Sequence, residues 1–293
     1  MKKYLLGVLL FSIISCGSSD ELDNQIPDIN PPLGKIKTLT IKDEELTNSA
    51  VSVIEKLDFK FEYNNDKLIK VWDINGNYTE NLDYANGLLT SISIEGNSYP
   101  GLSDPSPFSE KRRLIYDDNQ RLVKVENLNI NYEKNYKTFE YPSEDVIIVK
   151  NYIDNYSGIP FNTYMLKIYI NNKNVTKVER YEEGNLSKLG NIITYEYENN
   201  INPDFLIDRN RILALPEYAY NIFMLQDYSQ ISRNNVSKKN VYYFGSLPNS
   251  PKKEIKMISQ YQNNGLPSII YYQEKVSDNT PNDFLRVSAI YGY

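Results

Sequence analysis

Residues 57–63 read Leu-Asp-Phe-Lys-Phe-Glu-Tyr, so apolar and charged side chains alternate without a break. Successive side chains of a β-strand point to opposite faces, and this stretch therefore predicts a strand with one face in a core and the other in water. Asn64-Asn65-Asp66 follows, with residue types that favour turns. We expect a second strand from Leu68 to Trp72, followed by Asn75-Gly76, a strong signal for a hairpin turn.

The same strand–turn–strand unit recurs along the rest of the chain. Each copy has a short β-rich run, a turn rich in Asn, Asp or Gly, and a second run with Leu, Val or Ile. The first runs of these copies lie at residues 82–84, 114–116, 139–141, 167–169 and around Tyr261. Repeated units of this kind bury their apolar faces against their neighbours. We therefore predict an all-β fold, an extended and twisted antiparallel sheet of repeated hairpins, either open or curled into a half-barrel.

One stretch, from Asn202 to about Ser250, breaks this rhythm. Pro216-Glu217 is followed by Tyr218, Ile222 and Leu225, which predicts a short helix over residues 216–225 with proline in its first turn and one apolar stripe. We expect this helix to cover part of the sheet. Residues 35–293 are then a single β-sheet domain.

The first residues of the chain have the pattern of a secretory signal. Two lysines precede an apolar run from Tyr4 to Ile14, and that run is shorter than the ~20 residues of a membrane-spanning helix. Ile13-Ile14-Ser15-Cys16 resembles the lipobox of bacterial lipoproteins, in which the cysteine is acylated and begins the mature chain. Cys16 is the only cysteine, and lipidation explains a lone cysteine in an exported protein. We expect residues 1–15 to be a signal peptide and Cys16 to be the lipidation site.

Residues 16–34 have the composition of a flexible tether, with Gly, Ser, Pro and acidic residues and few large apolar side chains. Asp20, Glu21 and Asp23 resemble the signal that exports lipoproteins of Bacteroidota to the outer face of the outer membrane. The alternative is a solvated linker whose charges have no addressing role. We expect an outer-membrane lipoprotein, with the cell surface preferred over the periplasmic side.

The composition excludes several classes of function. The chain has no histidine, which removes imidazole bases and histidine-bound zinc, and no further cysteine is present to replace it. No glycine-rich phosphate loop occurs in the sequence. With 32 basic and 38 acidic residues, the net charge is −6, and the short basic clusters do not predict a nucleic-acid surface. We expect no cofactor, no metal and no nucleic-acid partner.

The hairpin units also carry a family resemblance. Tyr116-Asp117-Asp118-Asn119-Gln120-Arg121-Leu122 resembles the YD repeat of Rhs-type surface proteins, although it lacks the usual glycine before Arg121. The whole layout is similar to uncharacterised lipoproteins of Bacteroidota, including an Asn202-Pro203 element and the turn at Tyr261–Pro267. This resemblance implies a fold and a cell-envelope location, and it implies no activity.

Few residues stand out as candidate sites. The 26 tyrosines either form aromatic rows for sugars or peptides, or simply pack between strands. Trp72, the only tryptophan, is a weak ligand-binding candidate. Asp117-Asp118 and Glu182-Glu183 are not acid–base couples, because neighbours on a strand point to opposite faces. The stretch from Asp73 to Asn77 predicts a hairpin turn rather than a calcium loop. We assign no catalytic residue.

The sequence thus predicts a membrane-anchored envelope lipoprotein with a non-catalytic binding or scaffolding role. Its expected partners are the membrane, through the lipid on Cys16, and a glycan or an envelope protein. Two alternatives remain open, a carboxylate-dependent enzyme acting on glycans and a subunit of a surface assembly. A transmembrane barrel is not expected, because Asp58, Lys60 and Glu62 on the outward face would lie in lipid.

Overall fold

The computed structural model describes residues 34–47, 50–97, 107–128, 135–153, 161–182, 186, 188–215, 228–243, 253–277 and 280–293. These residues form sixteen strands, two 3-10 helices and one α-helix. The strands are β1 (Thr38–Thr47), β2 (Ala50–Asn64), β3 (Lys67–Asp73), β4 (Tyr78–Ala85), β5 (Leu88–Gly96), β6 (Phe108–Tyr116), β7 (Leu122–Asn127), β8 (Tyr136–Ser143), β9 (Val146–Ile153), β10 (Phe161–Asn171), β11 (Asn174–Glu182), β12 (Leu189–Ile201), β13 (Asn234–Tyr243), β14 (Lys253–Tyr261), β15 (Pro267–Ser277) and β16 (Thr280–Gly292). The helices are η2 (Pro203–Leu206), α1 (Arg209–Ala214) and η4 (Tyr228–Ile231).

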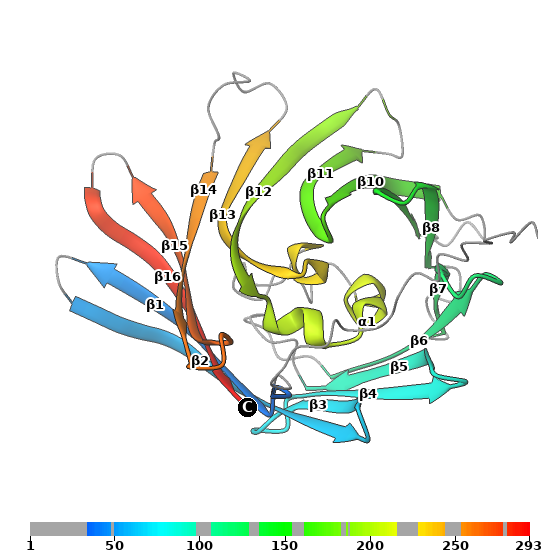
Figure 1. The fold of residues 1–293 in the computed structure, drawn as a ribbon, viewed down its shortest axis with the longest axis horizontal. Helices are drawn as coiled ribbons and strands as arrows, with labels where there is room; N and C mark the ends of the chain where they lie inside the picture. The colour runs from blue at the N-terminus through cyan, green and yellow to red at the C-terminus, as the bar shows by residue number, and fades with distance from the viewer. Residues whose placement is uncertain are drawn as a thin grey trace, which may run out of the picture. The chain divides into compact units, whose positions relative to one another are not determined.

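The strands close into one antiparallel barrel in which each strand pairs with its sequence neighbours and β16 pairs with β1 (Figure 1). The pairing of β1 with β16 runs from Thr38 opposite Gly292 to Leu46 opposite Phe284. The expectation of an open sheet or half-barrel was therefore wrong, although the all-β hairpin order was right. Closure leaves no sheet edge with unpaired backbone groups. The two strands that close the barrel are the first and the last in the sequence, so no local sequence pattern predicts their pairing.

The predicted turns form as tight hairpins because asparagine and glycine supply positive φ angles. Both central residues of the β4–β5 turn have positive φ, 50° at Asn86 and 88° at Gly87. The β10–β11 turn repeats this with Asn172 at 50° and Lys173 at 63°. Two successive positive φ angles match the right-handed twist of the flanking strands, which is why such turns favour two-residue hairpins. Lysine at the second position carries a strain that glycine avoids.

The recurrent tyrosines mark a β-bulge and link one hairpin to the next. The strand register shifts directly before Tyr63, Tyr84, Tyr116 and Tyr261. Tyr116 and three tyrosines of later strands donate a hydrogen bond to a backbone carbonyl in the preceding hairpin. The bonds are Tyr116 to Leu89 at 2.7 Å, Tyr141 to Leu122 at 2.8 Å, Tyr197 to Val175 at 2.5 Å and Tyr293 to Pro267 at 2.9 Å. These repeat tyrosines have a packing role, which is one of the two alternatives that the sequence left open.

Replacing Tyr141 with phenylalanine should lower the free energy of unfolding by about 1 kcal/mol, because it deletes the bond to the Leu122 carbonyl and keeps the ring. Tyr84→Phe is the matched control. The Tyr84 hydroxyl is buried and has no hydrogen-bond partner among the described residues, so its removal should be neutral or stabilising. Urea denaturation followed by circular dichroism measures both changes. Equal losses in the two variants would contradict a hydrogen-bonded tyrosine ladder.

The antiparallel order gives the barrel two different rims. Tight turns such as Asn65-Asp66, Asn86-Gly87 and Asn172-Lys173 lie on one rim, which we call the turn rim, together with the described ends at Gly34 and Tyr293. The other rim, which we call the loop rim, carries the connection from each odd-numbered strand to the next even-numbered strand, from β1–β2 to β15–β16.

The described parts of the segment between β12 and β13, residues 202–215 and 228–233, lie inside the ring of strands (Figure 1). We call them the plug. Four successive plug residues, Ile212 to Leu215, are each 2% exposed or less and belong to the apolar core that lines the barrel wall. The described wall and plug residues therefore share one apolar core inside the barrel.

The described helix, α1, is not the helix that the sequence predicted. It ends at Ala214, before Pro216, and the predicted helix over residues 216–225 lies outside the described residues. The side chain of Asp208 caps its first turn by accepting from the Asn210 amide at 2.8 Å. The C-cap of the helix is Leu215, whose backbone amide donates to the Arg211 carbonyl.

The outer face of the barrel is charged. Apolar side chains such as Leu114 and Val149 point inward, and Lys60, Glu62 and Arg113 are exposed. Ion pairs between neighbouring strands on the outer face are Arg113–Glu126, Glu140–Lys150 and Lys238–Glu254. A transmembrane barrel has the reverse pattern, with an apolar band outside and a polar interior. The described outer face is therefore suited to water.

Candidate functional site

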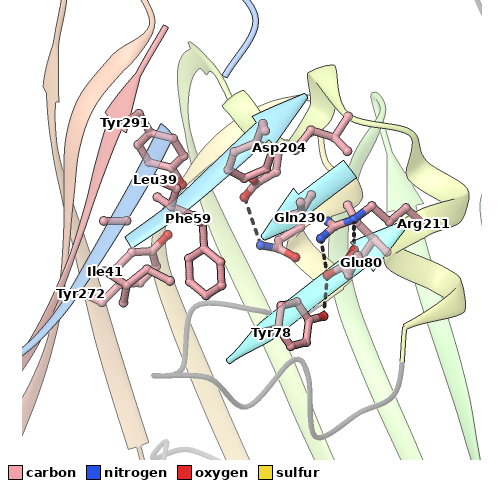
Figure 2. Close-up of a pocket in the computed structure, with 15 residues that line it drawn as sticks. Leu39, Ile41, Phe59, Tyr78, Glu80, Asp204, Arg211, Gln230, Tyr272 and Tyr291 are labelled. Atoms are coloured by element: carbon pink, nitrogen blue, oxygen red, sulfur yellow. Dashed lines mark hydrogen bonds and ion pairs between the residues drawn. The ribbon is translucent and has the colours of Figure 1, made fainter. Parts of the chain in front are cut away.

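A cavity of about 40 Å³ lies between the plug and the barrel wall, at the seam where β1 and β16 close the barrel. The wall contributes residues of β1 to β4, β15 and β16, and the plug contributes Asp204, Arg211 and Gln230 (Figure 2). Five aromatic rings line it, those of Phe59, Phe61, Tyr78, Tyr272 and Tyr291. The cavity has room for a few water-sized groups, and it is far smaller than pockets that hold drug-sized ligands.

A buried ion pair joins the plug to the wall in this cavity. The guanidinium of Arg211 donates to both carboxylate oxygens of Glu80, at 2.7 and 2.8 Å (Figure 2). The two side chains are only 9% and 3% exposed. The Tyr78 hydroxyl donates a third bond to Glu80 at 2.5 Å. Burial lowers the pKa of Arg211, but the Glu80 carboxylate outweighs burial and raises the pKa above its usual value.

Asp204 is the second carboxylate of the cavity, and no ion pair comparable to Glu80–Arg211 balances its negative charge among the described residues. Its side chain accepts a hydrogen bond from the Gln230 amide at 3.0 Å, within the plug. Burial raises the pKa of Asp204 to about 6, and the charge of Arg211 opposes this only in part. Glu80 and Arg211 cancel each other, so the cavity carries one net negative charge when Asp204 is ionised.

Two cations of the barrel wall hold the other end of the plug. Arg112 of β6 donates to the Ala214 carbonyl at 2.9 Å, and Lys137 of β8 donates to the Leu215 carbonyl at 2.9 Å. Both donors are buried. These carbonyls lie at the C-terminal end of α1, where no further helical turn can satisfy them. Through Arg211 and the C-terminal end of α1, the plug is thus fastened to three strands of the wall, β4, β6 and β8.

The chemistry of this site does not match a glycosidase. Such enzymes place two carboxyl groups about 5–10 Å apart around a bound sugar ring. Both Glu80 oxygens already accept strong bonds, and the cavity is too small for a sugar. The arrangement can hold a proton or a small charged group, and it locks the plug in place.

The structure keeps the sequence-derived candidates apart from this cavity. Trp72 is half-buried on β3, and the Lys70 ammonium lies 5.2 Å from its ring centre. The predicted turn after β3 is confirmed, since Asp73 accepts from the Asn75 and Asn77 amides at 3.2 and 3.3 Å. Asp117 likewise accepts from the Asn119 and Arg121 amides in its turn. Cys16 and Glu183 lie outside the described residues.

Sequence reasoning missed Glu80, Asp204 and Arg211. One signal was available for Glu80, because it occupies an inward position between the buried residues Tyr78 and Leu82. A charge at an inward position of a strand needs a buried partner. Its partner is 131 positions away in the chain, and no spacing rule connects the two.

Comparison with known proteins adds little beyond the fold. No protein-family model and no curated protein matches the chain. Among solved structures, a porin-like protein from Bacteroides uniformis ATCC 8492 is similar over 89% of this chain and 97% of its own length, with 9% sequence identity and a TM-score of 0.36. No conclusion about function follows from a likeness at this level.

No described helix is long and apolar enough to cross a bilayer. Within the same residues, no group of three or more cysteine or acidic side chains is placed to hold a metal ion.

Proposed function

We propose that this chain is a non-catalytic, lipid-anchored envelope protein whose barrel stands in water and binds a glycan or another envelope protein. The observation that carries the proposal is the charged outer face of the described strands around an apolar core, since a transmembrane barrel has the reverse pattern. A water-facing barrel in the envelope needs a separate attachment, and lipid on Cys16 supplies one. The Tyr-containing hairpins support kinship with the uncharacterised Bacteroidota lipoproteins that the sequence resembles.

The binding face in this proposal is the loop rim. Five of the seven large apolar side chains that are exposed among the described residues lie there, namely Ile74, Leu128, Phe161, Leu186 and Tyr243. The described chain starts at the opposite rim, where Lys37 pairs with Gly292. Exposed large apolar side chains at one end of a barrel are typical of interaction sites.

Site-specific photo-crosslinking in intact cells tests this binding face. A photoreactive residue at Phe161 should give a discrete adduct, and the same residue at Asp66 on the turn rim should not. The Asp66 side chain is 96% exposed, which makes it a matched and accessible control. Adducts from Asp66 alone, or from neither position in any growth condition, would contradict the proposal.

Cys16→Ser should release the protein from the membrane fraction, because each buried methylene of an acyl chain contributes about 0.8 kcal/mol to anchoring. Fractionation of cells expressing the wild type and the variant measures this. Retention of the serine variant in membranes would show that the barrel itself inserts.

The side of the outer membrane is tested by adding protease to intact cells and to lysed cells. Our proposal of surface exposure predicts loss of the domain from intact cells. Survival until lysis would place the domain in the periplasm and would leave the acidic residues of the tether as a plain linker.

A further inference from the structure

The cavity at the barrel seam has the features of a site for a small cation. It combines one uncompensated carboxylate, that of Asp204, with aromatic rings on the barrel side. Figure 2 shows Asp204 and Gln230 facing the cavity from the plug, and Phe59, Tyr78, Tyr272 and Tyr291 facing it from the wall. We propose that this cavity binds a small monovalent ammonium-type cation, such as an alkylammonium group, between Asp204 and the aromatic wall.

The charge balance of the cavity supports a cation over an anion. The charged groups that line it are Glu80 on β4, Arg211 on α1 and Asp204 on η2. Glu80 and Arg211 neutralise one another through two hydrogen bonds. Asp204 has one neutral donor, Gln230. An anion would meet an unpaired carboxylate, whereas a cation restores neutrality.

The aromatic wall favours an ammonium-type cation over a strongly hydrated metal ion. The faces of aromatic rings attract cations through their quadrupole, most effectively when the cation has left water. The same wall carries the hydroxyl groups of Tyr78, Tyr272 and Tyr291. Burial raises the pKa of Tyr78 and that of Tyr291 well above 10, so these two tyrosines add no competing negative charge. The cavity volume of about 40 Å³ limits the ligand to a group the size of a few waters.

Thermal unfolding of the purified full-length protein at pH 8 tests the inference, with methylammonium chloride as the probe and sodium chloride at equal ionic strength as the reference. The expected result is a rise in Tm that saturates with methylammonium and is absent with sodium. Asp204→Asn should abolish the rise, and Asp66→Asn, an exposed control, should keep it. At pH 4, where Asp204 carries its proton, the rise should be lost.

Three outcomes would overturn the inference. Methylammonium could give no rise at pH 8, sodium could give the same rise, or Asp204→Asn could respond like the wild type. This test does not depend on the proposed envelope function, because it uses purified protein and no partner.

Discussion

Arg211→Met should lower the free energy of unfolding by about 3–5 kcal/mol, the usual cost of leaving one partner of a buried ion pair alone. The variant strands the Glu80 carboxylate, which is 3% exposed, with only the Tyr78 hydroxyl as a donor. It also removes the link between α1 and β4 inside the barrel. Urea denaturation followed by circular dichroism gives the change in free energy.

Arg113→Met is the matched control for this prediction. Arg113 also pairs with a glutamate, Glu126, but it lies on the outer face and is 57% exposed. Exposed pairs contribute about 0–1 kcal/mol, so this variant should unfold near the wild-type midpoint. Similar losses of unfolding free energy in both variants would show that the buried Glu80–Arg211 pair contributes no more to stability than an exposed pair.

The double variant Glu80→Met/Arg211→Met separates the attraction between the two charges from the cost of removing them from water. It removes both charges, and apolar replacements of a buried pair are often neutral. We expect it to be more stable than Arg211→Met alone, with a coupling energy well above the error of the cycle. An additive result would mean that the two side chains do not interact in the folded protein.

Asp204→Asn should stabilise the protein at pH 8 by about 3 kcal/mol. The pKa of Asp204 is about 6 in the folded protein, against about 3.9 in an unfolded chain. The folded state therefore binds the proton more tightly, and the stability present at low pH is lost as the pH rises through about 4 to 6. Asparagine stays neutral throughout and can still accept from Gln230.

The pH profile of the free energy of unfolding checks this prediction. Wild type and Asp204→Asn should have nearly the same stability at pH 3.5 and should diverge between pH 4 and pH 7. Asp66→Asn, with its side chain in solvent, should follow the wild-type profile. A constant offset between wild type and Asp204→Asn at every pH would contradict the ionisation of a buried carboxyl.

The repeated hairpins could be predicted from the sequence because their determinants are local. Alternation at residues 57–63, and turn residues such as Asn86-Gly87, place strands and turns without reference to any distant segment. Closure of the barrel could not be predicted in this way. It depends on β1 pairing with β16, and the register of that pair is set by the shape of the whole sheet.

The plug and its site escaped prediction for a related reason. The plug residues do not alternate because they lie inside the barrel instead of joining the sheet. The helix predicted over residues 216–225 lies outside the described residues and stays a prediction. The fold encloses Asp204, Glu80 and Arg211 together, and only this makes them a site. The chain has 38 acidic residues, and no sequence pattern distinguishes Glu80 and Asp204 from the others.

The behaviour of residues 17–293 in detergent-free buffer tests most directly whether this is a water-facing barrel around an apolar core. We predict a monodisperse protein on size exclusion, with a β-rich spectrum and one cooperative unfolding transition that detergent does not improve. A fragment that aggregates in buffer, and acquires its β-structure only in micelles or lipid vesicles, would contradict the account.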